Sequence, residues 1–136
     1  MVKSCDRKES PAEFINSAHE LEKLTMRLTL RENAIPKRYR YILGQPLCTA
    51  ARDLNRNIVY ANVIYVNSKD TYQARRKYQV KARLILADYF ELMRLAFELL
   101  PIKTSVMDEW QALANKEQRA LIGWIEADSK RYKEFI

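Results

Sequence analysis

Apolar residues recur at spacings of three and four along most of this 136-residue chain. This is the period of an amphipathic helix, because residues i, i+3, i+4 and i+7 share one helical face. The chain has two Gly and four Pro, which are too few turn residues for a sheet of several strands. The pattern therefore predicts an all-α fold of long helices joined by short loops.

The first predicted helix begins with a cap signature at Ser10-Pro11, where a proline costs nothing because the first helical N–H has no partner. It ends near Ala34, because Pro36 disfavours α conformation at Ile35. Its apolar stripe comprises Phe14, Ala18, Leu21, Thr25 and Leu28.

The second predicted helix has a proline close to its start. Pro46 has no N–H to donate to the Ile42 carbonyl. Either the helix is kinked there or its regular part begins near Gln45, with a turn or distorted helix over residues 37–45. Its apolar stripe comprises Leu43, Leu47, Ala50, Leu54, Ile58, Ala61 and Tyr65.

The third predicted helix has Ser68 as its N-cap and is ended by Pro101. Its apolar stripe comprises Tyr78, Ala82, Ile85, Tyr89, Leu92, Ala96 and Leu99. Ser105 and Asp108 are typical of the start of a fourth helix. Its inner side comprises Val106, Trp110, Leu113, Leu121 and Trp124.

Four helices with short connections predict an antiparallel up-down-up-down four-helix bundle. We assign residues 11–127 to the bundle, residues 1–10 to a flexible leader and residues 128–136 to a polar C-terminal tail. No apolar run approaches the roughly 20 residues needed to cross a bilayer, and no secretory leader is visible. We therefore expect a cytoplasmic protein with no membrane partner.

Two stretches are apolar on more than one side of the expected helices. Residues 58–66 are apolar nearly all round, and residues 84–100 carry Leu86, Phe90, Met93 and Phe97 outside the main stripe. A helix that is apolar on both sides must be covered on both sides. A subunit interface is our leading explanation, and a thick or irregular core in a monomer is the alternative.

Positive charge is concentrated in the middle of the chain. Residues 37–83 contain eleven Lys or Arg against two acids, which leaves +9; the remainder has thirteen basic and fifteen acidic residues, or −2. Ordinary solvated faces mix signs, so this excess favours a polyanionic ligand, with RNA or DNA first. The candidate nucleic-acid-binding residues are Lys37, Arg38, Arg40, Arg52, Arg56, Arg75, Arg76, Lys77, Lys81 and Arg83.

Helical geometry places these cations on outer faces. Arg52 and Arg56 are one turn apart and point away from the second apolar stripe, while Arg76 and Arg83 share one face of the third helix. Contacts would be mainly to phosphate and therefore salt-dependent and weakly sequence-specific. Three tyrosines interleaved with the cations are suited to stacking on unpaired bases, namely Tyr39, Tyr41 and Tyr72.

Catalytic and metal-binding patterns are not found in the sequence. The single histidine, His19, has no Cys or His partner at zinc-site spacing, and Cys5 and Cys48 have no redox spacing. The carboxylates of Glu117 and Asp128 have the pattern of ordinary surface charges. We therefore expect no cofactor, no metal and no enzymatic activity.

The string Ile35-Pro36-Lys37-Arg38-Tyr39-Arg40-Tyr41-Ile42-Leu43-Gly44-Gln45 resembles the inter-helix signature of a known bundle family. That family includes the accessory variability determinant (Avd) proteins of diversity-generating retroelements and similar proteins encoded in intervening sequences of large ribosomal RNA genes. The likeness in layout covers roughly residues 12–127, including the ending Leu121-Ile122-Gly123-Trp124-Ile125.

The resemblance implies a homopentameric barrel with a basic surface. It also implies a reverse transcriptase partner and its template RNA, with a role in mutagenic cDNA synthesis. Two alternatives remain open: a bundle of the ribosomal intervening-sequence type, and a protein–protein scaffold that has no reverse transcriptase partner. In the scaffold alternative, the basic face docks an acidic protein.

Overall fold

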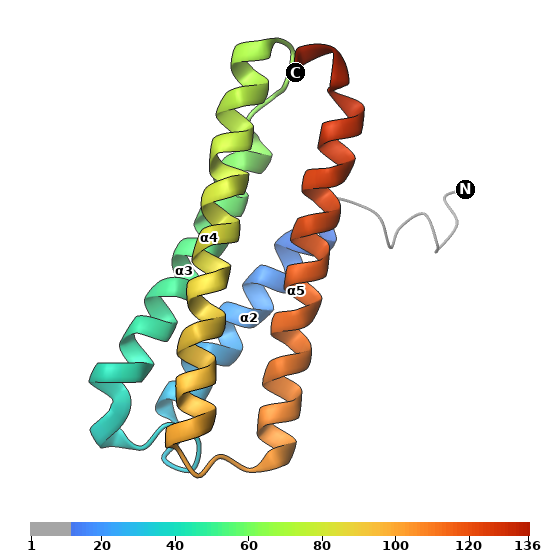
Figure 1. Ribbon diagram of the computed structural model, residues 1–136. Coiled ribbons are helices and arrows are strands. Elements are labelled where there is room, and N and C mark those ends of the chain that lie inside the picture. Colours follow the sequence, from blue (N-terminus) through green and yellow to red (C-terminus); the bar gives the residue numbers. More distant parts are fainter. Residues whose placement is uncertain (1–11) are drawn as a thin grey trace.

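The computed structural model describes residues 12–136 (Figure 1). Within that range the fold is all-α, and its four helices pack against one another as a helical bundle. The helices are α2 (Ala12–Leu30), α3 (Gln45–Val63), α4 (Lys69–Leu99) and α5 (Thr104–Arg131). Successive helices run in opposite directions, with α2 crossing behind the longer α4 and α5 (Figure 1). The predicted leader and the predicted Ser10 cap lie outside the described residues.

Helix α2 buries the whole of its predicted stripe, from Phe14 to Leu28. It ends at Leu30 rather than Ala34, and the chain then turns, with the Ile35 N–H bonded to the Arg31 carbonyl at 3.0 Å. The next residues form the irregular segment expected from Pro46: a 3₁₀ turn η1 (Lys37–Tyr39) followed by a π-helical turn η2 (Arg40–Gly44). The regular helix α3 starts at Gln45, as predicted, because Pro46 then occupies its first turn. We call residues 36–44 the elbow.

Helix α4 confirms the predicted Ser68 cap, which forms a reciprocal capping box with Thr71. Its buried stripe differs from the prediction, because the core side also contains two polar residues, Arg75 and Gln79. Of the predicted stripe, Ala82, Tyr89 and Ala96 are buried, Leu99 is exposed and the other three residues are half-buried. The buried stripe comprises Tyr72, Arg75, Gln79, Ala82, Leu86, Tyr89, Met93 and Ala96.

Helix α5 differs from its prediction at both ends. It begins at Thr104 and no side chain caps it, so the predicted cap at Ser105 and Asp108 is wrong. It continues to Arg131, followed by a 3₁₀ turn η3 (Lys133–Phe135), so the predicted boundary at residue 127 falls inside a helix. Of its predicted inner side, Trp110, Leu121 and Trp124 are buried and the other two residues are half-buried.

The core is centred on a hydrogen-bonded triad that joins three helices. Trp110 Nε1 of α5 donates to the Tyr89 hydroxyl of α4 at 2.6 Å, and the Thr25 hydroxyl of α2 lies 2.6 Å from the same oxygen. The Thr25 hydroxyl donates to the Leu21 carbonyl at 2.6 Å, so the Tyr89 hydroxyl donates to Thr25. Each buried polar atom of the triad therefore has a partner, which fixes the register of the three helices.

Candidate nucleic-acid interface

The predicted cations lie in three separate places on the bundle. Lys37, Arg38 and Arg40 belong to the elbow, at the opposite end of the molecule from the start of α4 (Figure 1). Two arginines lie along α3 and the remainder along α4. The concentration of charge in one stretch of sequence therefore does not produce a single patch that contains all these cations.

Within the elbow, Arg40 has a structural role. Its Nε donates to the Thr29 carbonyl at 2.9 Å and its Nη2 to the Leu30 carbonyl at 3.3 Å, so it satisfies the last carbonyls of α2. Lys37 and Arg38 are exposed, with the Arg38 guanidinium 5.3 Å from the centre of the Tyr39 ring. Two of the three elbow cations are therefore accessible to an anion.

Arg52 and Arg56 project from the outer side of α3, as predicted. Both side chains are exposed, while the opposite side of the helix is buried through Leu54 and Ile58. Neither arginine forms an ion pair within the part of the chain that the structure describes. Arg52 borders a small cleft that also contains Glu22 of α2, so an acid lies near this arginine although the two form no ion pair.

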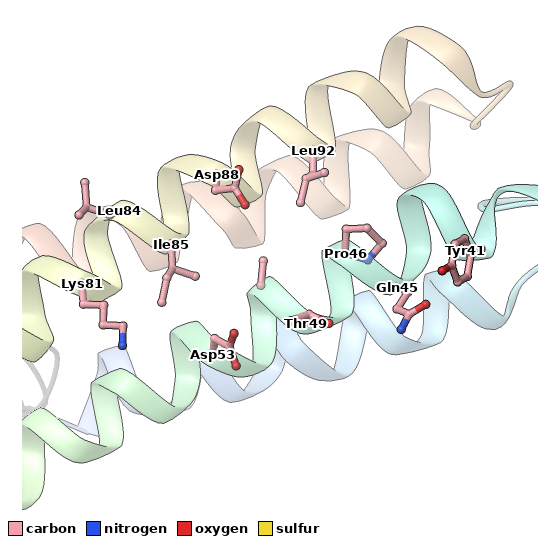
Figure 2. Close-up of a pocket in the computed structure, with 11 residues that line it drawn as sticks. Tyr41, Gln45, Pro46, Thr49, Asp53, Lys81, Leu84, Ile85, Asp88 and Leu92 are labelled. Atoms are coloured by element: carbon pink, nitrogen blue, oxygen red, sulfur yellow. The ribbon is translucent and has the colours of Figure 1, made fainter.

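The cations of α4 divide between its two flanks. Lys81 lies beside α3, in a groove that also contains Asp53 (Figure 2). Arg76 lies beside α5, where its Nη1 donates to the Ser129 hydroxyl at 3.1 Å, and Arg83 borders a small cleft against the same helix. The predicted shared face of Arg76 and Arg83 is thus the side towards α5. Lys77 is exposed one turn before Lys81.

Arg75 is not part of the surface. Its side chain is buried, and its Nε forms an ion pair with Asp128 Oδ2 at 2.9 Å. The guanidinium also lies 5.1 Å from the Trp124 ring centre and 5.8 Å from that of Tyr132. A group enclosed in this way is unable to reach a nucleic acid, so its place among the candidate residues is corrected.

The tyrosines predicted to stack on bases are mostly engaged in packing. Tyr72 is 7% exposed and lies 5.9 Å, between ring centres, from Tyr132, and Tyr39 is half-buried against the core. Tyr41 is free, with 80% of its surface exposed. Tyr65, predicted to line the core side of the second helix, lies beyond the end of α3 and is also 80% exposed.

Sequence reasoning missed three cations near the C-terminus. Lys130, Arg131 and Lys133 were assigned to a tail, but the structure carries them on the last turn of α5 and on η3. The Tyr72–Tyr132 contact and the Arg76–Ser129 hydrogen bond hold that end of α5 against the first turns of α4. Ile125, Asp128 and Tyr132 are three and four positions apart, as residues on one helical face are. This spacing was the available signal that the helix continues.

Two carboxylates that were expected at the surface are buried. Glu117 has no exposed surface, and neither of its carboxyl oxygens has a hydrogen-bond partner within the described residues. Burial raises its pKa to about 9, an effect that the nearby Lys116 only partly offsets. Asp128 is neutralised by Arg75. No cluster of three or more metal-ligating side chains occurs in the described part of the chain.

A groove of about 710 Å³ runs between α3 and α4 (Figure 2). Apolar side chains line it from both helices, with Asp53, Asp88 and Lys81 as its charged members. Beside it, Leu84 is 67% exposed and Leu95 is 44% exposed. The apolar excess expected on this helix is therefore real, but the residues at the surface differ from those predicted, since Leu86 and Met93 are in the core.

Comparisons with protein-family models, with curated proteins and with solved structures find no match to this chain. Within residues 12–136, no helix combines the length and the apolarity that a membrane span requires.

Proposed function

We propose that this protein is a non-catalytic accessory protein that binds RNA or DNA and assembles with copies of itself. The observation that carries the proposal is the set of exposed cations on the outer sides of α3 and α4, of which Arg52, Arg56, Lys77 and Lys81 have no ion-pair partner among the described residues. Exposed cations that form no ion pair repel one another, and a polyanion lying against them offsets that repulsion.

Self-association supports nucleic-acid binding because it repeats each cluster of cations around an assembly. The exposed apolar residues Leu84, Leu95 and Leu99 on α4 and the groove between α3 and α4 supply a surface of the kind that subunit interfaces bury. The elbow string resembles the Avd-type signature, and this resemblance extends the proposal to a homopentameric barrel.

The same resemblance extends the proposal to a partner protein, a reverse transcriptase of a diversity-generating retroelement. In that setting the bundle would support mutagenic reverse transcription of a template RNA. A gene for a reverse transcriptase beside this one, with paired template and variable repeats, would support the partnership. A neighbouring large ribosomal RNA gene would favour the intervening-sequence type of bundle.

The experiment that tests nucleic-acid binding is charge reversal on the outer cations. We expect a variant with Arg52, Arg56, Lys77 and Lys81 changed to Glu to lose binding to mixed-sequence RNA and DNA in a filter assay. The affinity for nucleic acid falls as salt rises. If all four side chains contact phosphate, their removal makes the slope of log affinity against log salt concentration less steep by about 3. The matched control reverses four other exposed cations, Arg27, Arg31, Lys116 and Arg119; its affinity is expected to stay close to wild type.

Unchanged affinity in the four-residue variant, with its helical content intact, would contradict the proposal. The apolar groove favours the scaffold alternative, which a pull-down tests. In that alternative, the protein retains a partner protein but no RNA, and salt releases the partner. In that case charge reversal would release the protein, while oligonucleotides would fail to bind even the wild type.

A further inference from the structure

Tyr65 is held outward by the segment that joins α3 to α4. The chain is extended here, with φ −78° and ψ 119° at Ile64 and φ −159° and ψ 170° at Ser68. Side chains in an extended segment alternate in direction. Val66 is buried and Ile64 is half-buried, so the ring between them is directed into solvent, with 80% of its surface exposed.

This segment is fixed by hydrogen bonds rather than loosely tethered. The backbone N–H groups of Asn67 and Ser68 both donate to the Thr71 hydroxyl at 3.0 Å, and the Thr71 N–H donates back to the Ser68 hydroxyl at 3.2 Å. An aromatic ring on a fixed backbone loses little conformational freedom when it binds a flat partner. The burial of Val66 and the hydrogen bonds of Asn67 and Ser68 therefore restrain the backbone next to Tyr65.

Several cations lie at the same end of the bundle as this tyrosine, where α4 begins and α5 ends. The hydrogen bond from Arg76 to Ser129 and the contact between the Tyr72 and Tyr132 rings bring the last turn of α5 to the first turns of α4. The cations of this end are Lys69, Arg76, Lys77, Lys130, Arg131 and Lys133. Against these six stand three surface carboxylates, Asp70, Glu126 and Glu134, because Asp128 is already paired with Arg75.

We propose that this end of the bundle binds an unpaired stretch of RNA or DNA, with one base stacked on Tyr65 and the adjacent phosphates against the surrounding cations. The inference rests on the proposed nucleic-acid function and names its substrate class. Cations alone serve duplex and single strand alike, but an exposed ring needs a free base face, which a duplex keeps inside its stack. The amides of Asn62 and Asn67, exposed on either side, are suited to hydrogen bonds with a base edge.

The test compares one 12-nucleotide single strand with the same sequence annealed to its complement, by fluorescence anisotropy at fixed salt. We expect Tyr65→Ala to weaken single-strand binding about 5- to 150-fold, the range measured for one lost base stack. Tyr65→Phe keeps the ring and is expected to remain within about twofold of wild type. Duplex affinity and the salt slope of Tyr65→Ala are expected to be unchanged, since no phosphate contact is removed.

Tyr41→Ala is the comparison variant, because Tyr41, a tyrosine predicted to stack on bases, is equally exposed but belongs to the elbow rather than to this end of the bundle. An equal loss in Tyr41→Ala and Tyr65→Ala, or no loss in Tyr65→Ala, would overturn the inference while leaving nucleic-acid binding in place. A wild type that binds neither strand form would remove the proposed function itself. Anionic phosphatidylserine vesicles that bind through Tyr65, with strand binding unaffected by its loss, would assign this end to a lipid surface and also overturn the inference.

Discussion

Arg75 Nε lies 2.9 Å from Asp128 Oδ2, and both side chains are almost completely buried. The pair joins the beginning of α4 to the end of α5, and the Gln79 amide donates to the same carboxylate oxygen at 2.8 Å. The guanidinium lies beside the Trp124 ring, which itself stacks on Phe14 of α2 at 3.8 Å between ring centres. Three helices therefore meet at this one charge pair, and the end of α5 is part of the bundle.

Replacing Arg75 with Met is expected to lower the free energy of unfolding by about 3 kcal/mol, because the buried Asp128 carboxylate loses its counter-ion. Methionine keeps much of the contact with Trp124. Urea denaturation measures the loss, and the double variant Arg75→Met with Asp128→Leu is expected to recover most of it. A stable Arg75→Met variant with weakened RNA binding would instead return Arg75 to the nucleic-acid interface.

Glu117 gives the stability of the protein a distinct pH dependence. Burial raises its pKa to about 9, whereas the carboxyl of the unfolded chain titrates near 4.5. Between these values the folded protein holds a proton that the unfolded chain has released. The stability from this group is thus complete below pH 4.5 and falls as pH rises towards 9.

Glu117→Gln is expected to remove this dependence, because an amide does not titrate. Between pH 5 and 8, the free energy of unfolding of the wild type should therefore fall relative to that of the variant. The expected change is roughly 1 kcal/mol per pH unit. Urea titrations at pH 5, 6, 7 and 8 measure it, with Glu109→Gln on the exposed side of α5 as the control. Parallel pH profiles for Glu117→Gln and wild type would show that the carboxyl is ionised and paired in the folded state.

The two glycines are expected to respond to alanine in opposite directions. A Cβ at Gly44 would lie 2.7 Å from Thr29 Cγ2, and Thr29 is held by its hydrogen bond to the Thr25 carbonyl. Gly44→Ala should therefore destabilise the elbow by about 1–3 kcal/mol. A Cβ at Gly123 meets nothing within 4 Å, so Gly123→Ala should stabilise α5 by up to about 1 kcal/mol. Thermal denaturation of both variants tests the pair, and a shift of the same sign in both would contradict it.

The helices were predictable because local rules govern them. The stripe of α2, the Ser68 cap and the irregular segment before Gln45 all follow from residues close together in sequence.

The buried polar residues were not predictable from the apolar pattern. Arg75, Gln79, Glu117 and Asp128 lie on the core sides of α4 and α5, and each is assigned to the surface by its residue type. Only the pairing of Arg75 with Asp128, 53 positions apart, makes the burial of that arginine favourable. The count of charges along the sequence identified the basic segment. It did not show that these cations are divided among the elbow, α3 and α4, because the directions of the helices decide which cations are neighbours.

The proposed self-assembly leads to a last prediction, which concerns the exposed leucines of α4. Leu84 and Leu95 lie on the flank beside the groove, and a carboxylate in their place would have to lose its water in any interface formed there. We expect Leu84→Glu with Leu95→Glu to reduce the mass measured by light scattering from about five chains, the number implied by the resemblance, to one. Because both side chains are already exposed in the single chain, its helical content should not change.

The control for this variant places the same two charges on α5, as Ala112→Glu with Gln118→Glu, where both side chains are exposed outside the groove. It is expected to keep the mass of the wild type. A wild-type chain that already has the mass of one subunit would contradict self-assembly. The apolar flank of α4 would then be open to a different protein, and the cations of one subunit alone would have to account for any binding of nucleic acid.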